Sequence, residues 1–91
     1  MEFEWDEKKH RANIGKHGVD FAEASTVFGD PLELSILDPD HSTGEHRFPS
    51  VGLSARGRVL VVSYVERTTN RIRIIGARRA SLTELRDYES E

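Results

Sequence analysis

The sequence contains no cysteine in its 91 residues, so both a disulfide framework and a thiolate metal site are excluded. It also lacks any apolar run that approaches the length of a membrane span, and its first five residues lack the features of a signal peptide. We therefore expect a soluble, cytoplasmic chain. Repeats, linkers and low-complexity tracts are absent too, and one core is usual at this length. Residues 1–91 are therefore expected to form a single domain.

Lysine is absent from residues 45–80, although the chain has 13 Lys and Arg residues in all. The basic residues of this segment are eight arginines, set against two glutamates, whereas the whole chain has a formal net charge of -3. Arginine presents a planar fork of donors that matches phosphate, and it stays charged at any working pH. A solvated charged face is the ordinary explanation for a charge run. The arginine-only composition favours recognition of an anion instead.

Capping residues and hydrophobic periodicity predict an α+β fold with two N-terminal helices, an antiparallel sheet of three to four strands and a C-terminal helix. The predicted helix starts are Asp6, Asp20 with Glu23 as its capping-box partner, and Ser81 with Glu84 in the same role. Gly18 is expected to end the first helix. The predicted strands are residues 32–36, 45–54, 58–66 and 71–79, with residues 3–5 as a short strand or an extended lead-in.

A hairpin of residues 58–66 and 71–79 forms the centre of the predicted sheet, because two β-branched runs flank a short polar loop. A symmetric loop places Glu66 opposite Arg71 and Tyr64 opposite Arg73, and side-chain alternation then defines two faces. The face expected to pack on the core is almost wholly apolar: Val59, Val61, Ser63, Val65, Ile72, Ile74 and Gly76. The face expected to stay open carries Arg58, Tyr64, Glu66, Arg71, Arg73 and Arg79 around Leu60, Val62, Ile75 and Ala77.

Several short motifs resemble the BrnT-type toxins in their order and spacing. In the first half they are Phe3-Glu-Trp-Asp6, Lys16-His-Gly-Val19, Phe21, Ala24, Val27-Phe28 and Asp30-Pro31. In the second half they are Glu45-His-Arg-Phe48, Gly52, Ser54, the run from Gly57 to Tyr64, the run from Arg71 to Ala80, Glu84 and Tyr88. Each motif alone is weak, but together they are specific and span nearly the whole chain.

This resemblance implies a RelE-like fold and a ribonuclease toxin of a type II toxin–antitoxin pair. It further implies RNA cleavage without a metal or other cofactor, and silencing by a ribbon-helix-helix antitoxin. That antitoxin, and not the toxin, would contact operator DNA when the pair represses its own operon. The alternative is a toxin-like binding module that acts with the antitoxin in autoregulation and cuts no RNA.

Cleavage of RNA without a metal requires a base for the 2′-hydroxyl, fixed donors for the dianionic phosphorane and a proton for the leaving 5′-oxygen. We expect Arg73 and Arg58, with Arg47 from the neighbouring strand, to form the arginine clamp. Glu66 is the expected base because it is the only carboxylate on the open face of the predicted hairpin. His17 is either the proton donor or a residue that caps the end of its helix.

The remaining candidates each keep two interpretations. Tyr64 stacks a nucleobase or lies at the rim of the core. Arg71 binds substrate or, as we favour, forms a cross-strand ion pair with Glu66. Arg78 emerges into the site or pairs with a helix carboxylate such as Glu84, and Arg79 is a further substrate-binding residue. The spacing of the histidines and aspartates does not resemble a zinc site.

Overall fold

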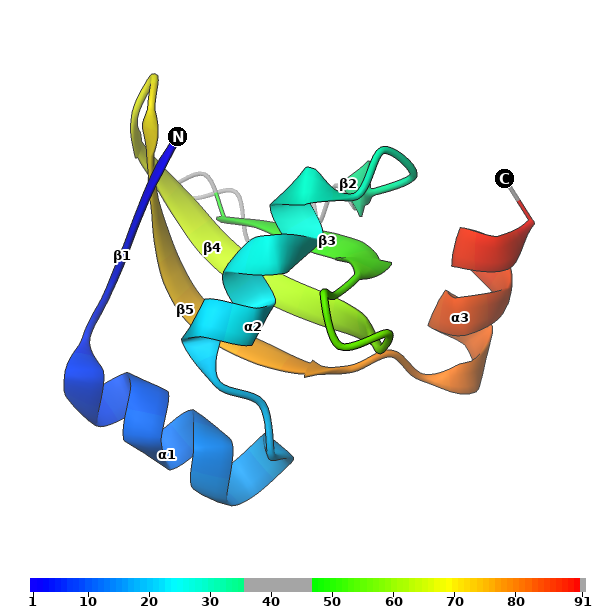
Figure 1. Cartoon of the computed structure of the whole chain (residues 1–91), viewed down its shortest axis with the longest axis horizontal. Coiled ribbons are helices and arrows are strands. Elements are labelled where there is room, and N and C mark those ends of the chain that lie inside the picture. The colour runs from blue at the N-terminus through cyan, green and yellow to red at the C-terminus, as the bar shows by residue number, and fades with distance from the viewer. Residues whose placement is uncertain (36–46, 91) are drawn as a thin grey trace.

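A computed structural model describes residues 1–35 and 47–90, with side chains described from Pro49 onward in the second range. The predicted loop at 38–44 and the first residues of the strand predicted from Glu45 lie outside these ranges. Five strands form one mixed sheet in the order β1-β5-β4-β3-β2 (Figure 1). Their bounds are β1 Glu2–Trp5, β2 Leu34–Ser35, β3 Arg47–Leu53, β4 Val59–Thr68 and β5 Arg71–Arg79.

The sheet is larger than predicted and is not wholly antiparallel. Residues 2–5 form a true strand, which pairs in parallel with β5 from Glu2 opposite Arg71 to Trp5 opposite Ile74. The prediction of three to four antiparallel strands was therefore incomplete. A parallel pairing between two ends of the chain depends on long-range contacts, which a short alternating motif does not reveal.

The helices begin and end where the capping residues predict. Helix α1 (Glu7–His17) starts after Asp6, whose side chain accepts from the amides of Lys8 and Lys9, and ends at Gly18 with φ 69°. Helix α2 (Phe21–Thr26) follows Asp20 and continues into the 3-10 helix η1 (Val27–Gly29). Helix α3 (Leu82–Glu89) has the complete capping box of Ser81 and Glu84. Within the described residues, no helix is long and apolar enough to cross a membrane.

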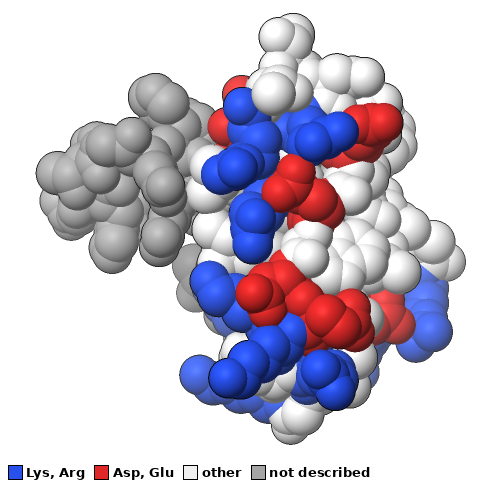
Figure 2. Space-filling model, turned by 90° about the vertical axis from the view of Figure 1, so that its left-hand side faces the viewer, with Lys and Arg blue, Asp and Glu red and all other residues white. Residues whose placement is uncertain are grey.

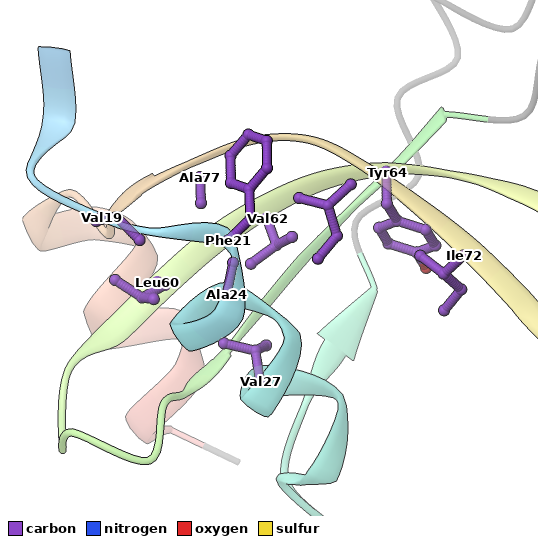
Figure 3. Packing of buried hydrophobic residues seen from close by; sticks show 10 residues of the cluster. Val19, Phe21, Ala24, Val27, Leu60, Val62, Tyr64, Ile72 and Ala77 are labelled. Atoms are coloured by element: carbon purple, nitrogen blue, oxygen red, sulfur yellow. The ribbon is translucent and has the colours of Figure 1, made fainter. Parts of the chain in front are cut away.

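The main core lies between the sheet and the segment formed by the α1–α2 connection, α2 and η1, which contributes Val19, Phe21, Ala24 and Val27 (Figure 3). Its sheet residues are Leu60, Val62 and Tyr64 from β4 and Ile72, Ile74 and Ala77 from β5, all at most 5% exposed. The predicted faces were therefore wrong for β4, whose even-numbered residues pack on the core, and for the second half of β5, where Ala77 and not Gly76 does so.

Two register shifts explain this error. Ser63 pairs with Gly76 but Tyr64 pairs with Ile74, so Ile75 is an extra residue on β5; a second shift lies between Glu66 and Thr68. Each inserted residue exchanges the faces of the residues that follow it.

Asn13 fixes α1 to the edge of β5 beyond the last residue of β1. Its amide nitrogen donates to the carbonyls of Val19 and Ala77 at 2.8 and 2.9 Å, and its oxygen accepts from the Ala77 amide at 3.1 Å. The side chain thus takes the place of a strand there, and it is 9% exposed. On the opposite face of the sheet, a smaller cluster contains Val51, Val61 and Tyr88. It packs α3 against the end of the sheet that is far from the β4–β5 hairpin loop.

Candidate functional site

The face of the sheet opposite α1 and α2 is covered by α3 only at one end. The remainder, which we call the open face, consists of Ser63 and Val65 on β4 with Arg71, Arg73 and Arg78 on β5. Residues that pair across neighbouring strands share a face. Val65 pairs with Arg73, which in turn pairs with Glu4, so an arginine and a carboxylate lie beside an apolar residue in one row.

Carboxylates of β1 hold the arginines at the hairpin end of the open face. Nη1 of Arg73 donates to Oε2 of Glu4 at 3.2 Å, and Nη2 of Arg71 donates to Oε2 of Glu2 at 2.9 Å. The hydrogen bond from Arg71 holds the pKa of Glu2 below its usual value, and the same contact raises the pKa of Arg71. Figure 2 views the molecule from the side on which β1 lies and shows acidic side chains lying between basic ones. The favoured pair of Arg71 with Glu66 is therefore replaced by a pair with Glu2.

Arg78 lies on the same face, opposite Val61, and contacts the first turn of α3. Its two terminal nitrogens donate to the two carboxylate oxygens of Glu84 at 2.7 and 2.9 Å. This contact lowers the pKa of Glu84 from 4.5 to about 2, against an opposing effect of burial. Of the two predicted positions for Arg78, the ion pair with a helix carboxylate is confirmed. Its side chain is still 45% exposed, so the ion pair lies at the surface.

Arg58 lies on the other side of the sheet and does not join a clamp with Arg73. Its Nε donates to Oε2 of Glu23 at 2.9 Å, Nη2 contacts Oε1 of the same carboxylate, and Nη2 also donates to the Gly18 carbonyl at 3.2 Å. Glu23 is 2% exposed in its side chain and also accepts from Ser54 Oγ at 2.7 Å. The capping box predicted for Asp20 is thus only half formed, because the Glu23 side chain turns to Arg58.

Tyr64 and Glu66 occupy the helix-covered face of β4. Tyr64 is 5% exposed and its ring meets Phe28 edge-on at a centroid distance of 4.9 Å, so it has no face free to stack a base. Glu66 is exposed and pairs with Ile72, whereas Arg73 pairs with Val65. The expectation that Glu66 and Arg73 share a face is therefore wrong, because both residues lie between the bulge at Ile75 and the second register shift, which together pair Glu66 with Ile72.

The other candidates are dispersed. His17 is exposed in the last turn of α1. Arg79 is exposed at the end of β5, opposite Leu60. Arg47 opens β3 beside Val65, and its side chain lies outside the described part of the chain. The structure therefore brings together Arg71, Arg73 and Arg78 on one face, and separates Arg58, Tyr64, Glu66 and His17 from them.

Comparison with known proteins identifies the family. Residues 5–84 match the family model described as the ribonuclease toxin BrnT of type II toxin–antitoxin systems. The chain belongs to the BrnT family. The crystal structure of the Brucella abortus ribonuclease toxin BrnT has a similar fold, with a TM-score of 0.69 and 24% sequence identity over 89% of this chain and 97% of that one. A comparison with curated proteins finds no significant match.

Membership of the BrnT family confirms the resemblance seen in the sequence and supports a toxin role with ribonuclease activity. It also implies RNA targets and an antitoxin as partner. The BrnT-like fold here is α+β, with three α-helices and a five-stranded mixed sheet among the described residues.

The sequence analysis missed the carboxylates of β1. Glu2 and Glu4 alternate with Phe3 and Trp5, a period-two pattern that places both acids on one face of a strand. That pattern could have indicated a strand with an acidic face, but not its arginine-rich neighbour. The described residues contain no group of three or more His, Asp or Glu side chains placed to hold an ion.

Proposed function

We propose that this chain is a toxin that cleaves RNA in the cytoplasm without a metal, and so inhibits translation and growth. In this proposal a cognate antitoxin of the ribbon-helix-helix type neutralises it, and the toxin reaches operator DNA only through that antitoxin. The observation that carries the proposal is the pair of Glu4 and Arg73 on the open face of a BrnT-family fold. A carboxylate and a guanidinium in contact are the two groups that metal-free cleavage most needs.

The proposed reaction begins when Glu4 accepts the proton of a ribose 2′-hydroxyl. The 2′-oxygen then attacks the adjacent phosphorus, and Arg73 donates to the phosphorane oxygens as their negative charge develops. The bond to the 5′-oxygen breaks, that oxygen takes a proton from solvent at the uncovered face, and a 2′,3′-cyclic phosphate remains. In this proposal Arg78 and Arg71, which lie on the same strand and face as Arg73, contact neighbouring phosphates of the RNA.

Arg73 has a position suited to this role. Its side chain is 38% exposed, and its Nη1 is oriented by Glu4. Val65 beside it in the register is half-buried and gives the site an apolar wall on that side. Because the Arg73 donor is already oriented, it loses little conformational freedom when it binds the transition state. The apolar surface beside it lowers the local dielectric, so its electrostatic stabilisation of the transition state is larger than in open water.

The deciding experiment measures cleavage of an RNA oligonucleotide in EDTA by the wild type and by Arg73→Ala. We expect the rate to fall by about 10²–10³-fold, because one fixed donor to the transition state is lost. Arg67→Ala is the matched control, since Arg67 is exposed near the hairpin loop and forms no ion pair with the described residues. Wild-type cleavage by a folded Arg73→Ala, or loss of all cleavage in EDTA, would exclude this site or this chemistry.

A second candidate function is a binding module that acts with the antitoxin and cuts no RNA. One observation favours it: Arg58, Arg71, Arg73 and Arg78 each already contact a carboxylate. Phosphate would have to compete with these partners. Expression of the chain alone separates the two functions, because the nuclease arrests growth and its Arg73→Ala variant does not, whereas a binding module leaves growth unchanged in both forms.

A further inference from the structure

A groove lies at the end of the sheet far from the hairpin loop, between the β3–β4 turn, the end of β5 and α3. Its volume is about 530 Å³, within the range of about 300–1,000 Å³ that is usual for small-molecule sites. Residues with apolar side chains form part of its lining: Val59, Ala80 and Leu85. The Ala80 amide donates to the Val59 carbonyl at 3.0 Å, which fixes the backbone of two of these residues. The groove therefore has a partly apolar, well-ordered lining.

Two arginines line the groove and offer donors to an anion. Arg79 is exposed and makes no ion pair with any described residue. Arg58 is held through Nε and Nη2 by Glu23 and Gly18, and its Nη1 makes no hydrogen bond to the described residues. Among the described residues of the lining Glu89 is the one carboxylate, and Glu23, outside the lining, pairs with Arg58, so Arg79 is the arginine of the groove without a described ion-pair partner. One fixed and one adaptable guanidinium form a suitable receptor for a phosphate.

The third element of the lining is an aromatic ring held in place. Tyr88 donates its hydroxyl proton to Oδ2 of Asp30 at 2.5 Å, and its ring packs with Val51 and Val61. The hydrogen bond to Asp30, together with burial, raises the pKa of the Tyr88 hydroxyl, so it remains a neutral donor. Tyr88 is only 9% exposed, so its ring supports the wall of the groove and offers no free stacking face; the aliphatic part of the lining is what suits a flat, weakly polar group such as a nucleobase.

We propose that this groove binds one nucleotide of an RNA strand, with the base against the apolar lining and the phosphate at Arg79 and Arg58. This proposal rests on the proposed ribonuclease function, because the nucleotide in the groove belongs to the RNA substrate and lies away from the phosphodiester that is cleaved. Arg79 directly follows Arg78 but, by side-chain alternation, lies on the opposite face of β5, so an RNA strand that passes Arg78 on the open face has to turn round the end of β5 to reach the groove. Six residues of strand separate Arg73 from Arg79, or about 20 Å. The bound nucleotide is therefore remote from the reacting phosphate.

A direct test titrates the protein with adenosine 5′-monophosphate, followed by the NMR shifts of backbone amides. We expect shifts centred on Val59, Ala80 and Leu85, and at least about tenfold weaker binding of both inorganic phosphate and adenosine, since each lacks half of the contacts. Arg79→Ala is expected to weaken binding of the nucleotide about tenfold, and Leu85→Trp, which fills the groove, should do the same. Arg67→Ala is the matched control and should bind like the wild type.

Kinetics then separates this site from the proposed centre. Arg79→Ala should raise KM for an RNA oligonucleotide about tenfold with kcat nearly unchanged, because uniform binding is lost. On a dinucleotide, which does not extend to the groove, the effect should shrink below about twofold. An equal loss on both substrates would overturn the proposal and place Arg79 in the reaction itself.

The nucleotide titration decides the proposal even if the chain cuts no RNA. Absence of shifts at the groove would overturn it, as would tighter binding of an acidic hexapeptide than of the nucleotide, since that result would assign the groove to a protein segment. Localised shifts that disappear in Arg79→Ala would support it whether or not cleavage is found. Failure of the groove and failure of the ribonuclease function are thus distinguishable.

Discussion

Arg58 and Glu23 form an ion pair that joins the start of β4 to α2 across the edge of the main core. The carboxylate is almost wholly buried, and three groups satisfy it: Nε and Nη2 of Arg58 and the Ser54 hydroxyl. These contacts, with the hydrogen bond from Arg58 foremost, hold the pKa of Glu23 below its usual value although burial alone would raise it. The pair is therefore a structural connection first, whatever Arg58 also contacts in the groove.

Arg58→Met is expected to lower the free energy of unfolding by about 3–5 kcal/mol, because it leaves the Glu23 carboxylate buried without its cation. The double variant Arg58→Met with Glu23→Gln should recover at least about 1 kcal/mol of that loss, since no charge is then left unpaired. Urea unfolding of the two single variants and the double variant gives the coupling. Simple addition of the two single effects would show that the pair contributes nothing.

The second prediction compares two carboxylates as the base. Glu4→Gln should lower the rate of RNA cleavage by about 10²-fold or more, because the one carboxylate that contacts Arg73 among the described residues is lost. Glu66→Gln should leave the rate within about threefold of the wild type, because Glu66 lies on the opposite face of the sheet from Arg73. Both changes keep the shape of the side chain. If Glu66→Gln lowered the rate and Glu4→Gln did not, the catalytic site would lie on the helix-covered face of the sheet instead.

The third prediction concerns acid. The pKa of Glu84 is about 2 in the folded chain and 4.5 when unperturbed, so its contribution to stability is complete above pH 4.5 and is lost as the pH falls towards 2. Solvent screens the exposed side of Arg78, so we expect this loss to amount to about 1–2 kcal/mol. Glutamine can still complete the capping box. The unfolding midpoint of Glu84→Gln should therefore fall less than that of the wild type between about pH 5 and pH 2.

Asp87→Asn provides the matched control for this titration, because Asp87 is exposed in the same helix and the substitution makes the same change in net charge. Its midpoint should follow the wild-type curve throughout. If the Glu84→Gln curve did the same, the contact with Arg78 would have no role in the acid sensitivity of α3.

Local features of the fold could be predicted from the sequence, and long-range features could not. The caps at Asp6, Asp20 and Ser81 act within three residues of each helix start, so the residues that decide them are visible together. By contrast, the place of β1 beside β5 depends on a partner almost seventy residues away, as in the pair of Glu4 and Arg73. Nothing near residue 4 identifies that partner.

The candidate site shows the same division. Arginine content identified Arg73 and Arg78 as residues of interest, but the faces of a strand depend on one-residue shifts that composition does not reveal. The bulge at Ile75 lies on β5, so it puts Ile72 and Ile74 on the same face as Tyr64 and Glu66 and leaves Arg73 on the opposite face. Asn13 shows the reverse case, since a polar residue on a helix gave no sign that it would bind a strand edge. Such errors arise where tertiary contacts, and not local preferences, choose between two structures.

The last prediction concerns Gly52, a buried residue of β3 that lies against η1. A Cβ at this position would lie 2.7 Å from Cγ1 of Val27, and 3.3 Å from both the Val27 carbonyl oxygen and Oδ2 of Asp30. Neither the backbone nor the Asp30 carboxylate, which is held by Tyr88 and the Leu53 amide, can move easily. Gly52→Ala should therefore lower the free energy of unfolding by about 1–3 kcal/mol.

Gly15→Ala is the control, because nothing lies within 4 Å of a Cβ there and alanine favours the helix. It should raise stability by about 0.5–1 kcal/mol. Val27→Ala removes the closest contact, so the double variant with Gly52→Ala should be at least about 1 kcal/mol more stable than the two single effects predict together. Strict additivity in urea unfolding would show that crowding against Val27 is not the reason for glycine at position 52.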